Sequence, residues 1–121
     1  MPKKILVVED EEAIREMLGI RLEEAGYETL FAIDGLSALN QVKENSPDLI
    51  LLDYTLPKMN GIDVCSQIKE NPRLSHIPVI LLSAYRREQI DRNHIADDYM
   101  PKPYDPDQLL QRISQLVEKS H

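Results

Sequence analysis

The sequence LILLDYTLPKMNG, which runs from Leu49 to Gly61, places four consecutive apolar residues directly before a single carboxylate, that of Asp53. An apolar run of this length is typical of a strand that is buried on both faces of a parallel sheet. The residues that follow include Pro57 and Asn60, which favour a loop. We therefore expect a buried strand that holds the Asp53 carboxylate at one edge of a sheet.

Two further apolar runs, Ile5–Val8 and Val79–Leu82, have the same character, and weaker strands are indicated at Glu28–Ile33 and Tyr99–Met100. Helical periodicity follows four of these strands, whereas residues 84–95, between the fourth and fifth strands, are the least clear. The helical segments are residues 14–25, 35–45, 62–70 and 106–117. This regular alternation predicts an α/β fold in which helices cover both faces of a mainly parallel sheet.

The composition narrows the class of protein. The chain has 121 residues and no internal linker or repeat, so we expect a single domain over residues 1–121. The net charge of −7 argues against nonspecific binding of nucleic acid and against adhesion to an anionic membrane. Cys65 is the one cysteine, so no intrachain disulfide can form. The apolar run at Ile5–Val8 stops at Glu9, too early for a signal peptide, and we expect a cytoplasmic protein.

Four of the five expected strands are followed by polar residues that could form one site. They are Glu9 and Asp10 after the first strand, Asp53 after the third, Ser83 after the fourth and Lys102 after the fifth. Because the carboxyl ends of parallel strands share one edge, where such sheets bind ligands, these side chains should converge. Each residue alone also has a structural explanation: an acidic first helical turn, a turn, a strand-ending hydroxyl or a solvated lysine. Asp34 ends the second strand, which we expect at the far edge, and should be only a helix cap.

Three converging carboxylates would repel one another. Two such charges at about 4 Å interact by roughly 4 kcal/mol at an effective dielectric constant near 20. A hard divalent cation removes this repulsion, and an all-oxygen set with room for water suits Mg²⁺. A carboxylate beside such an ion can accept a phosphoryl group, while a lysine and a hydroxyl stabilise charge on the transferring oxygens.

Four motifs at these strand ends resemble a known family. They are Val7–Asp10, Leu51–Gly61, Leu82–Ala84 and Asp97–Tyr104. Together they are similar to the receiver domain of two-component response regulators, in particular single-domain receivers of the chemotaxis type. The resemblance covers residue 3 to about residue 117. It implies a flavodoxin-like (βα)5 fold, a doubly wound parallel sheet of five strands in the order 2-1-3-4-5.

The resemblance also implies roles for individual residues. Asp53 would be the phosphoacceptor. The implied Mg²⁺ ligands are Asp10, Asp53, the backbone carbonyl of Thr55 and, through water, Glu9. The phosphoryl oxygens would contact the Ser83 hydroxyl, the Lys102 ammonium and the backbone N–H of Ala84. Tyr99 would be an aromatic switch that changes rotamer as Ser83 moves, and the Lys102–Pro103 peptide bond would be cis.

The implied partners are proteins. A histidine kinase or a histidine phosphotransfer protein would supply the phosphoryl group, and a downstream protein would read the switched surface. A homodimer that depends on phosphorylation belongs to the same set of expectations. Neither a direct nucleic-acid partner nor a membrane is expected. The protein would not be an enzyme beyond accepting its own phosphoryl group from a donor and losing it again.

The sequence departs from the family pattern in three places. Glu9 replaces the more common Asp, and Asn60 replaces an Asp before Gly61, which keeps a flexible turn position. Only 18 residues separate Ser83 from Lys102, fewer than is usual for the family. We therefore predict a shortened or irregular fourth helix.

Three other functions are compatible with parts of this pattern. A receiver-like scaffold that acts without phosphorylation would share the fold and the altered fourth helix. An Mg²⁺-dependent phosphohydrolase with an aspartate nucleophile commonly has a second Asp two residues after the first, where this chain has Thr55. A flavodoxin-type cofactor protein would need a glycine-rich phosphate loop after the first strand, and Glu9–Glu12 stands there instead.

Overall fold

In a computed structural model, which describes residues 2–119, strands and helices alternate throughout that range. The strands are β1 (Lys4–Val8), β2 (Glu28–Ala32), β3 (Leu49–Asp53), β4 (Val79–Ser83) and β5 (Asp98–Pro101). The helices are α1 (Glu12–Glu24), α2 (Gly35–Asn45), α3 (Gly61–Glu70), α4 (Arg87–Ile90) and α5 (Pro106–Lys119). The expected alternation of strand and helix is therefore confirmed.

The five strands form one parallel sheet in the order β2-β1-β3-β4-β5, as predicted. β1 and β3 are neighbours, and so are β3 and β4, so their carboxyl ends lie side by side. The register pairs Asp53 with Leu82, and Ser83 with Pro101. β2 lies at the edge, which separates Asp34 from the central strand ends.

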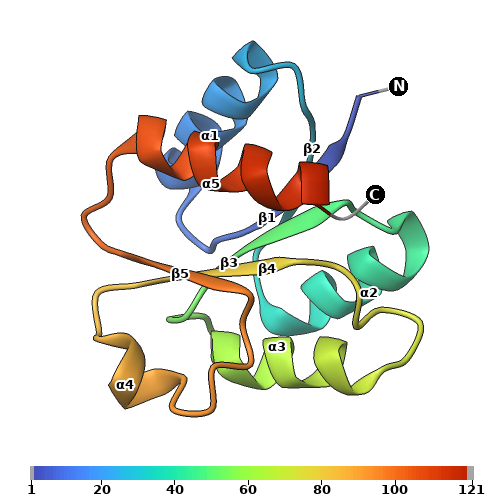
Figure 1. The fold of residues 1–121 in the computed structure, drawn as a ribbon, viewed down its shortest axis with the longest axis vertical. Helices are drawn as coiled ribbons and strands as arrows, with labels where there is room; N and C mark the ends of the chain where they lie inside the picture. Colours follow the sequence, from blue (N-terminus) through green and yellow to red (C-terminus); the bar gives the residue numbers. More distant parts are fainter. Residues whose placement is uncertain (1, 120–121) are drawn as a thin grey trace.

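Two layers of helices cover the sheet. Figure 1 shows α1 and α5 on one face and α2 and α3 on the other. Along β3 the side chains alternate between these layers: Leu49 and Leu51 pack toward α1 and α5, while Ile50 and Leu52 pack toward α2 and α3. All four are completely buried, which explains why the strand is apolar at every position.

Local signals at the helix ends act as the sequence indicates. The Asp34 carboxylate accepts a hydrogen bond of 2.8 Å from the Ser37 N–H at the start of α2, which confirms its role as a cap. Gly26 follows α1 with a φ of 93°, a left-handed conformation that favours glycine. Asp105 accepts the Asp107 N–H at 2.9 Å in the first turn of α5.

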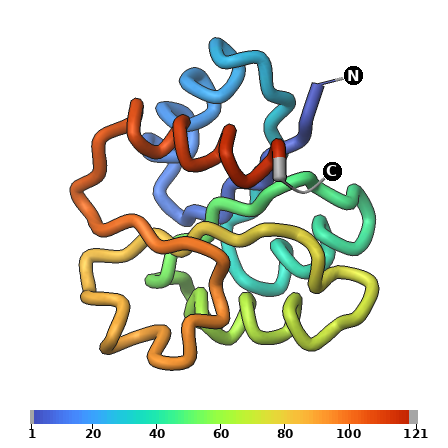
Figure 2. The backbone as a smooth tube through the Cα atoms, in the orientation of Figure 1, coloured from blue at the N-terminus to red at the C-terminus, as the bar shows by residue number. Residues whose placement is uncertain are grey.

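The fourth helix is short, as predicted. α4 has four residues, and residues 91–97 then lead to β5 without regular structure. Figure 2 shows this segment as a compact loop below β5, and both ends of the described chain on the opposite side of the molecule.

None of the helices within residues 2–119 has the length and apolar character needed to cross a bilayer. Burial raises the pKa of the Cys65 thiol to about 12, so this thiol stays protonated at neutral pH.

Candidate functional site

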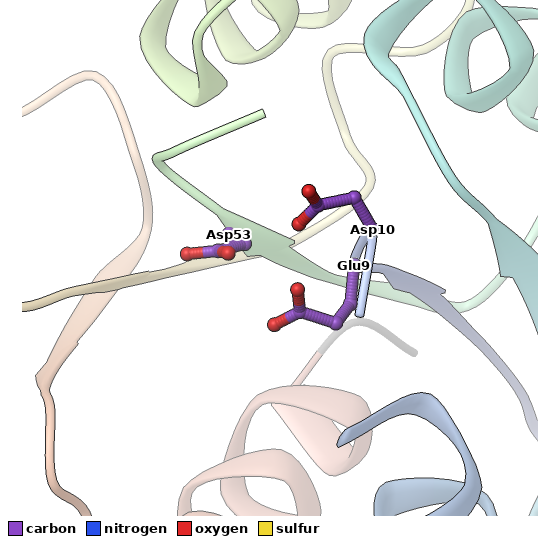
Figure 3. A group of neighbouring side chains, drawn as sticks. All are labelled: Glu9, Asp10 and Asp53. Carbon is purple, nitrogen blue, oxygen red and sulfur yellow. The ribbon is translucent and has the colours of Figure 1, made fainter. Parts of the chain in front are cut away.

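Three carboxylates meet at the carboxyl ends of β1 and β3. Glu9, Asp10 and Asp53 each offer an oxygen atom, and these atoms lie within 4.8 Å of one another. Figure 3 shows Glu9 and Asp10 extending from the end of β1 toward the side on which Asp53 leaves β3. The adjacency of β1 and β3 in the sheet therefore brings together residues that lie more than 40 positions apart in the chain.

The three carboxylates differ in burial. Glu9 is only 2% exposed and Asp53 only 4% exposed, whereas Asp10 is open to solvent. The backbone around Glu9 is fixed on both sides, because its N–H donates to the Ala32 carbonyl at 3.0 Å and its carbonyl accepts from Arg15 at 2.9 Å. Glu9, which the resemblance placed as an outer ligand acting through water, is thus among the more buried members of the cluster.

Burial dominates the protonation of Glu9. It raises the pKa of this carboxyl from 4.5 to about 7, and the negative charge of Asp53 acts in the same direction. The Glu11 N–H, which donates to Glu9 Oε2 at 3.1 Å, and the ammonium of Lys102 partly oppose the shift. Near neutral pH the Glu9 carboxyl group is therefore only partly ionised, and an added positive charge would favour its ionised form.

Lys102 is the cation of the site. Its Nζ lies 3.0 Å from Asp53 Oδ1 and 3.7 Å from Glu9 Oε1. Burial lowers the pKa of this ammonium, but the hydrogen bond to Asp53 and the charges of Asp53 and Glu9 outweigh burial, so its pKa is raised overall. The backbone also fixes Lys102, since its N–H donates to the Ser83 carbonyl at 2.8 Å and its peptide bond to Pro103 is cis, as expected.

Ser83 and Tyr99 are linked through the backbone of one residue, Tyr85. Ser83 is buried at the end of β4, and its Oγ accepts the Tyr85 N–H at 2.9 Å. The carbonyl of the same Tyr85 accepts the Tyr99 hydroxyl in a short hydrogen bond. The Tyr85 ring also contacts Tyr54 edge to face, with 5.8 Å between the ring centroids. Tyr85, to which the sequence pattern assigns no functional role, therefore connects the two residues expected to switch.

Thr55 and Ala84 lie where the sequence places them along the chain. Thr55 is two residues beyond Asp53, in the loop after β3, and Ala84 directly follows Ser83; both are exposed. The metal contact expected of the Thr55 carbonyl and the phosphoryl contact expected of the Ala84 N–H stay predictions.

Gly61 has a different role from the flexible turn that the sequence suggested. It is the first residue of α3, and its N–H donates to the Tyr54 carbonyl at 2.7 Å. A Cβ atom at this position would lie 2.6 Å from the Asp53 carbonyl oxygen and 2.8 Å from the Tyr54 Cα. The loop residue with a left-handed conformation is Lys58, whose φ is 70°. Glycine is thus required for close approach to the backbone of Asp53.

Lys102 also lines a mostly apolar cavity of about 470 Å³. It lies between α1, the residue that follows β4, and the connection from β5 to the start of α5. Its lining residues are Ile14, Met17, Ala84, Lys102, Pro103, Tyr104 and Pro106. The charged cluster is therefore bordered by a surface that could accept apolar side chains from another protein.

The donor set of the acidic cluster fits a hard divalent cation. All three side chains offer carboxylate oxygens, and two of them are buried at short range from each other. The Lys102 ammonium contacts Asp53 and Glu9, and a further positive charge would relieve the repulsion that remains among the acidic groups. Oxygen ligands with one side open to solvent suit Mg²⁺ better than a metal that prefers nitrogen or sulfur ligands.

Comparisons with known proteins agree with this geometry. The family model of the response regulator receiver domain matches residues 5–114. The alkaline phosphatase synthesis transcriptional regulatory protein PhoP of Bacillus subtilis is 40% identical, over 99% of this chain and 50% of its own length. The chain thus spans about half the length of the curated relatives it matches.

Solved structures of receiver domains have the same fold as this chain. The receiver domain of a signal transduction histidine kinase from Syntrophus aciditrophicus has a TM-score of 0.91 at 34% identity, covering 97% of this chain and 91% of that one. The receiver domain of the sensor histidine kinase PA1611 from Pseudomonas aeruginosa, solved with a magnesium ion coordinated in the active site cleft, has a TM-score of 0.86 at 25% identity, covering 98% and 99%. In sequence, fold and strand-end chemistry, this chain belongs to the response regulator receiver domains, the phosphoacceptor modules of two-component signalling.

Proposed function

We propose that Asp53 is the residue that accepts the phosphoryl group, and that residues 1–121 act as one receiver domain. The observation that carries the proposal is the pairing of the Asp53 carboxylate with the Lys102 ammonium at 3.0 Å, beside Glu9 and Asp10. A nucleophilic carboxylate for phosphoryl transfer needs positive charge directed at the oxygens that move with the phosphorus. Lys102 supplies one such charge from a fixed backbone.

The transfer begins with in-line attack by one Asp53 oxygen on the phosphorus of a phosphohistidine. As the new P–O bond forms, the P–N bond breaks, and the imidazole leaves with its electron pair and takes up a proton from solvent. The product is an aspartyl phosphate, which water later hydrolyses to regenerate Asp53 and inorganic phosphate. Lys102 and the Ser83 hydroxyl bind the phosphoryl oxygens, and Ala84 donates its N–H to them.

We also propose that the acidic cluster of this receiver binds Mg²⁺. Receiver domains bind Mg²⁺ in general, and the fit of the acidic cluster and the magnesium-bound relative from Pseudomonas aeruginosa support the same for this chain. Asp10, Asp53 and the Thr55 carbonyl would hold the ion, with Glu9 acting through water. Bound Mg²⁺ would supply positive charge to the phosphoryl oxygens and keep the acidic side chains ionised.

Protein partners complete the proposal. Histidine kinases act on receiver domains in general, and the apolar cavity between α1 and the β5–α5 connection supports docking of a kinase or phosphotransfer protein beside Lys102. A downstream protein would read the surface around Ser83 and Tyr99, and a phosphorylation-dependent homodimer is a further expected state. The domain is not an enzyme in its own right, since it transfers no phosphoryl group to a separate substrate. We further propose that the protein is located in the cytoplasm.

Intact-mass spectrometry tests the proposal. The protein is incubated with Mg²⁺ and acetyl phosphate, and the gain of one phosphoryl group is expected. Asp53→Asn should gain none, while Asp63→Asn, an exposed aspartate on α3, should gain one like the wild type. A phosphoryl adduct on Asp53→Asn, or its absence from the wild type, would overturn the assignment.

A further inference from the structure

The segment between β4 and β5 is organised by one buried carboxylate that phosphoryl transfer does not use. Asp91 follows α4 and is only 2% exposed. Its Oδ1 accepts the Ile95 N–H at 2.8 Å, and its Oδ2 accepts the Ala96 N–H at 3.2 Å. One side chain thus provides the hydrogen-bond acceptors that further turns of α4 would otherwise have supplied.

Arg87 completes this arrangement from the first residue of α4. Its Nε and Nη2 each donate to Asp91 Oδ2 at 3.3 Å, and Nη2 also donates to the Ala96 carbonyl at 2.6 Å. The Arg87 side chain is 19% exposed and that of Asp91 only 1%, so solvent screens the pair weakly. We call Arg87, Asp91, Ile95 and Ala96 the Asp91 network. It closes α4 and the loop after it into one ring of contacts.

The far end of this segment is anchored to the sheet. The Asp97 N–H donates to the Val79 carbonyl at 3.0 Å, and Asp97 Oδ2 accepts the Val79 N–H at 2.8 Å. Lys69 of α3 lies 2.6 Å from the same Oδ2. These contacts hold residue 97 at the start of β4, which is the end of the strand remote from Ser83.

The near end is held differently. The Tyr85 N–H donates to the Ser83 hydroxyl, and the Tyr85 carbonyl accepts the Tyr99 hydroxyl. Both partners are the side chains expected to move when the phosphoryl group arrives. A movement of Ser83 therefore acts directly on Tyr85, and along the chain it reaches residues 86–97 through Ala84 and Tyr85.

We propose that the Asp91 network makes residues 86–97 a rigid unit and confines the response to phosphorylation to a two-residue hinge, Ala84 and Tyr85. The signal then emerges as a change in the Tyr85 ring and in its contact with Tyr99, without displacement of α4. This inference rests on the proposed role of Asp53, since it describes how the state of that residue is passed on.

Amide hydrogen exchange, followed by NMR with and without Mg²⁺ and beryllofluoride, tests the proposal. Fluorine NMR first measures whether beryllofluoride is bound. On binding, exchange at the Tyr85 amide should rise by about tenfold or more, because Ser83 turns away from it, while the Ile95 and Ala96 amides stay within about twofold. Bound beryllofluoride with faster exchange at Ile95 and Ala96 would overturn the rigid unit and leave the phosphoacceptor assignment standing.

Asp91→Asn tests the network in the absence of any phosphoryl mimic. Exchange at the Ile95 and Ala96 amides should rise by about tenfold or more, while the Leu6 amide in β1 is unchanged and shows that the fold is intact. If this variant does not fold, Arg87→Lys keeps the charge but loses the two-pronged donation, and the same rise is expected. Unchanged exchange at Ile95 and Ala96 in the folded variant would refute the network. A failure of the wild type to bind beryllofluoride would instead count against the role of Asp53, and the variant result would still decide whether the network rigidifies this segment.

Discussion

The ammonium of Lys102 lies 3.0 Å from Oδ1 of Asp53, although the two residues are 49 positions apart in the sequence. The ends of β3 and β5 create this contact, with β4 between them. The backbone hydrogen bond from Lys102 to the Ser83 carbonyl fixes the lysine at the same edge of the sheet. A mobile surface lysine would lack this restraint, so the position of the charge is a property of the fold.

Removal of this charge should impair phosphoryl transfer. Lys102→Met deletes a donor aimed at the transferring oxygens, and loss of one such donor typically reduces a rate by about 10²-fold. The measurement is the rate of aspartyl phosphate formation with acetyl phosphate and Mg²⁺. Lys43→Met, an exposed lysine on α2, is the matched control and should react at the wild-type rate. Equal rates for the two variants would show that Lys102 has no part in the transfer.

The stability of the metal-free protein should depend on pH through Glu9. The pKa of its carboxyl group is about 7 in the folded protein, whereas an ordinary glutamate has a pKa of 4.5. Between these pH values the folded state therefore holds a proton that the unfolded chain releases. This contribution to stability is complete below pH 4.5 and is lost as the pH rises through 7. The expected loss is on the order of 3 kcal/mol. The pKa of Lys102 is raised above 10.5 and the pKa of Asp34 is lowered below 3.8, so neither group titrates between pH 4.5 and pH 7.

Urea denaturation in EDTA at pH 5 and pH 8 measures this dependence. Glu9→Gln removes the titrating group, so its free energy of unfolding should change less between the two pH values than that of the wild type. If the wild type and Glu9→Gln show the same pH dependence, burial of Glu9 does not control the protonation of the site.

Mg²⁺ should stabilise the folded protein, because the cluster exists only when β1 and β3 are paired. At ten times the dissociation constant the gain is about 1.4 kcal/mol, which corresponds to a rise in melting temperature of several degrees. Asp10→Asn removes an exposed ligand and should abolish most of the rise. Glu44→Gln, an exposed carboxylate on α2, should keep it. A melting temperature that does not respond to millimolar Mg²⁺ in the wild type would argue against the site.

Gly61→Ala should disturb the site without touching a charged group. Its Cβ would lie 2.6 Å from the Asp53 carbonyl oxygen, so the backbone around Asp53 or the start of α3 must move. We expect destabilisation of about 1–3 kcal/mol in chemical denaturation and slower phosphorylation. Asp63→Ala, two residues later on the exposed side of α3, is the control. Wild-type stability and rate in Gly61→Ala would mean that the loop accommodates a side chain freely.

The strand order was implied by the family resemblance. The buried strands are predicted by the residues themselves, because a run such as Leu49–Leu52 is best explained by burial between two layers of helices. The strand ends follow from the same reasoning, and so does the convergence of Asp10, Asp53 and Lys102. The burial of Glu9 was not predictable, since adjacent residues at a strand end differ in orientation and only the path of the chain into α1 decides between them.

In the region around α4, the sequence pattern predicts the length of the helix but not its contacts. The small number of residues between Ser83 and Lys102 predicts a short helix, and the spacing of Arg87 and Asp91 permits an ion pair. That the Asp91 carboxylate turns inward and accepts two backbone N–H groups depends on tertiary packing, which helical periodicity does not encode. The close approach of Gly61 to Asp53 is likewise a three-dimensional contact between two loop ends.

Identification of the phosphorylated side chain tests the central claim most directly. The protein is phosphorylated with acetyl phosphate and Mg²⁺, the acyl phosphate is reduced with borohydride, and peptide mass spectrometry locates the resulting homoserine. Homoserine is expected at position 53, with no reduced side chain at Glu9 or Asp10. Modification of another carboxylate in place of Asp53 would contradict it.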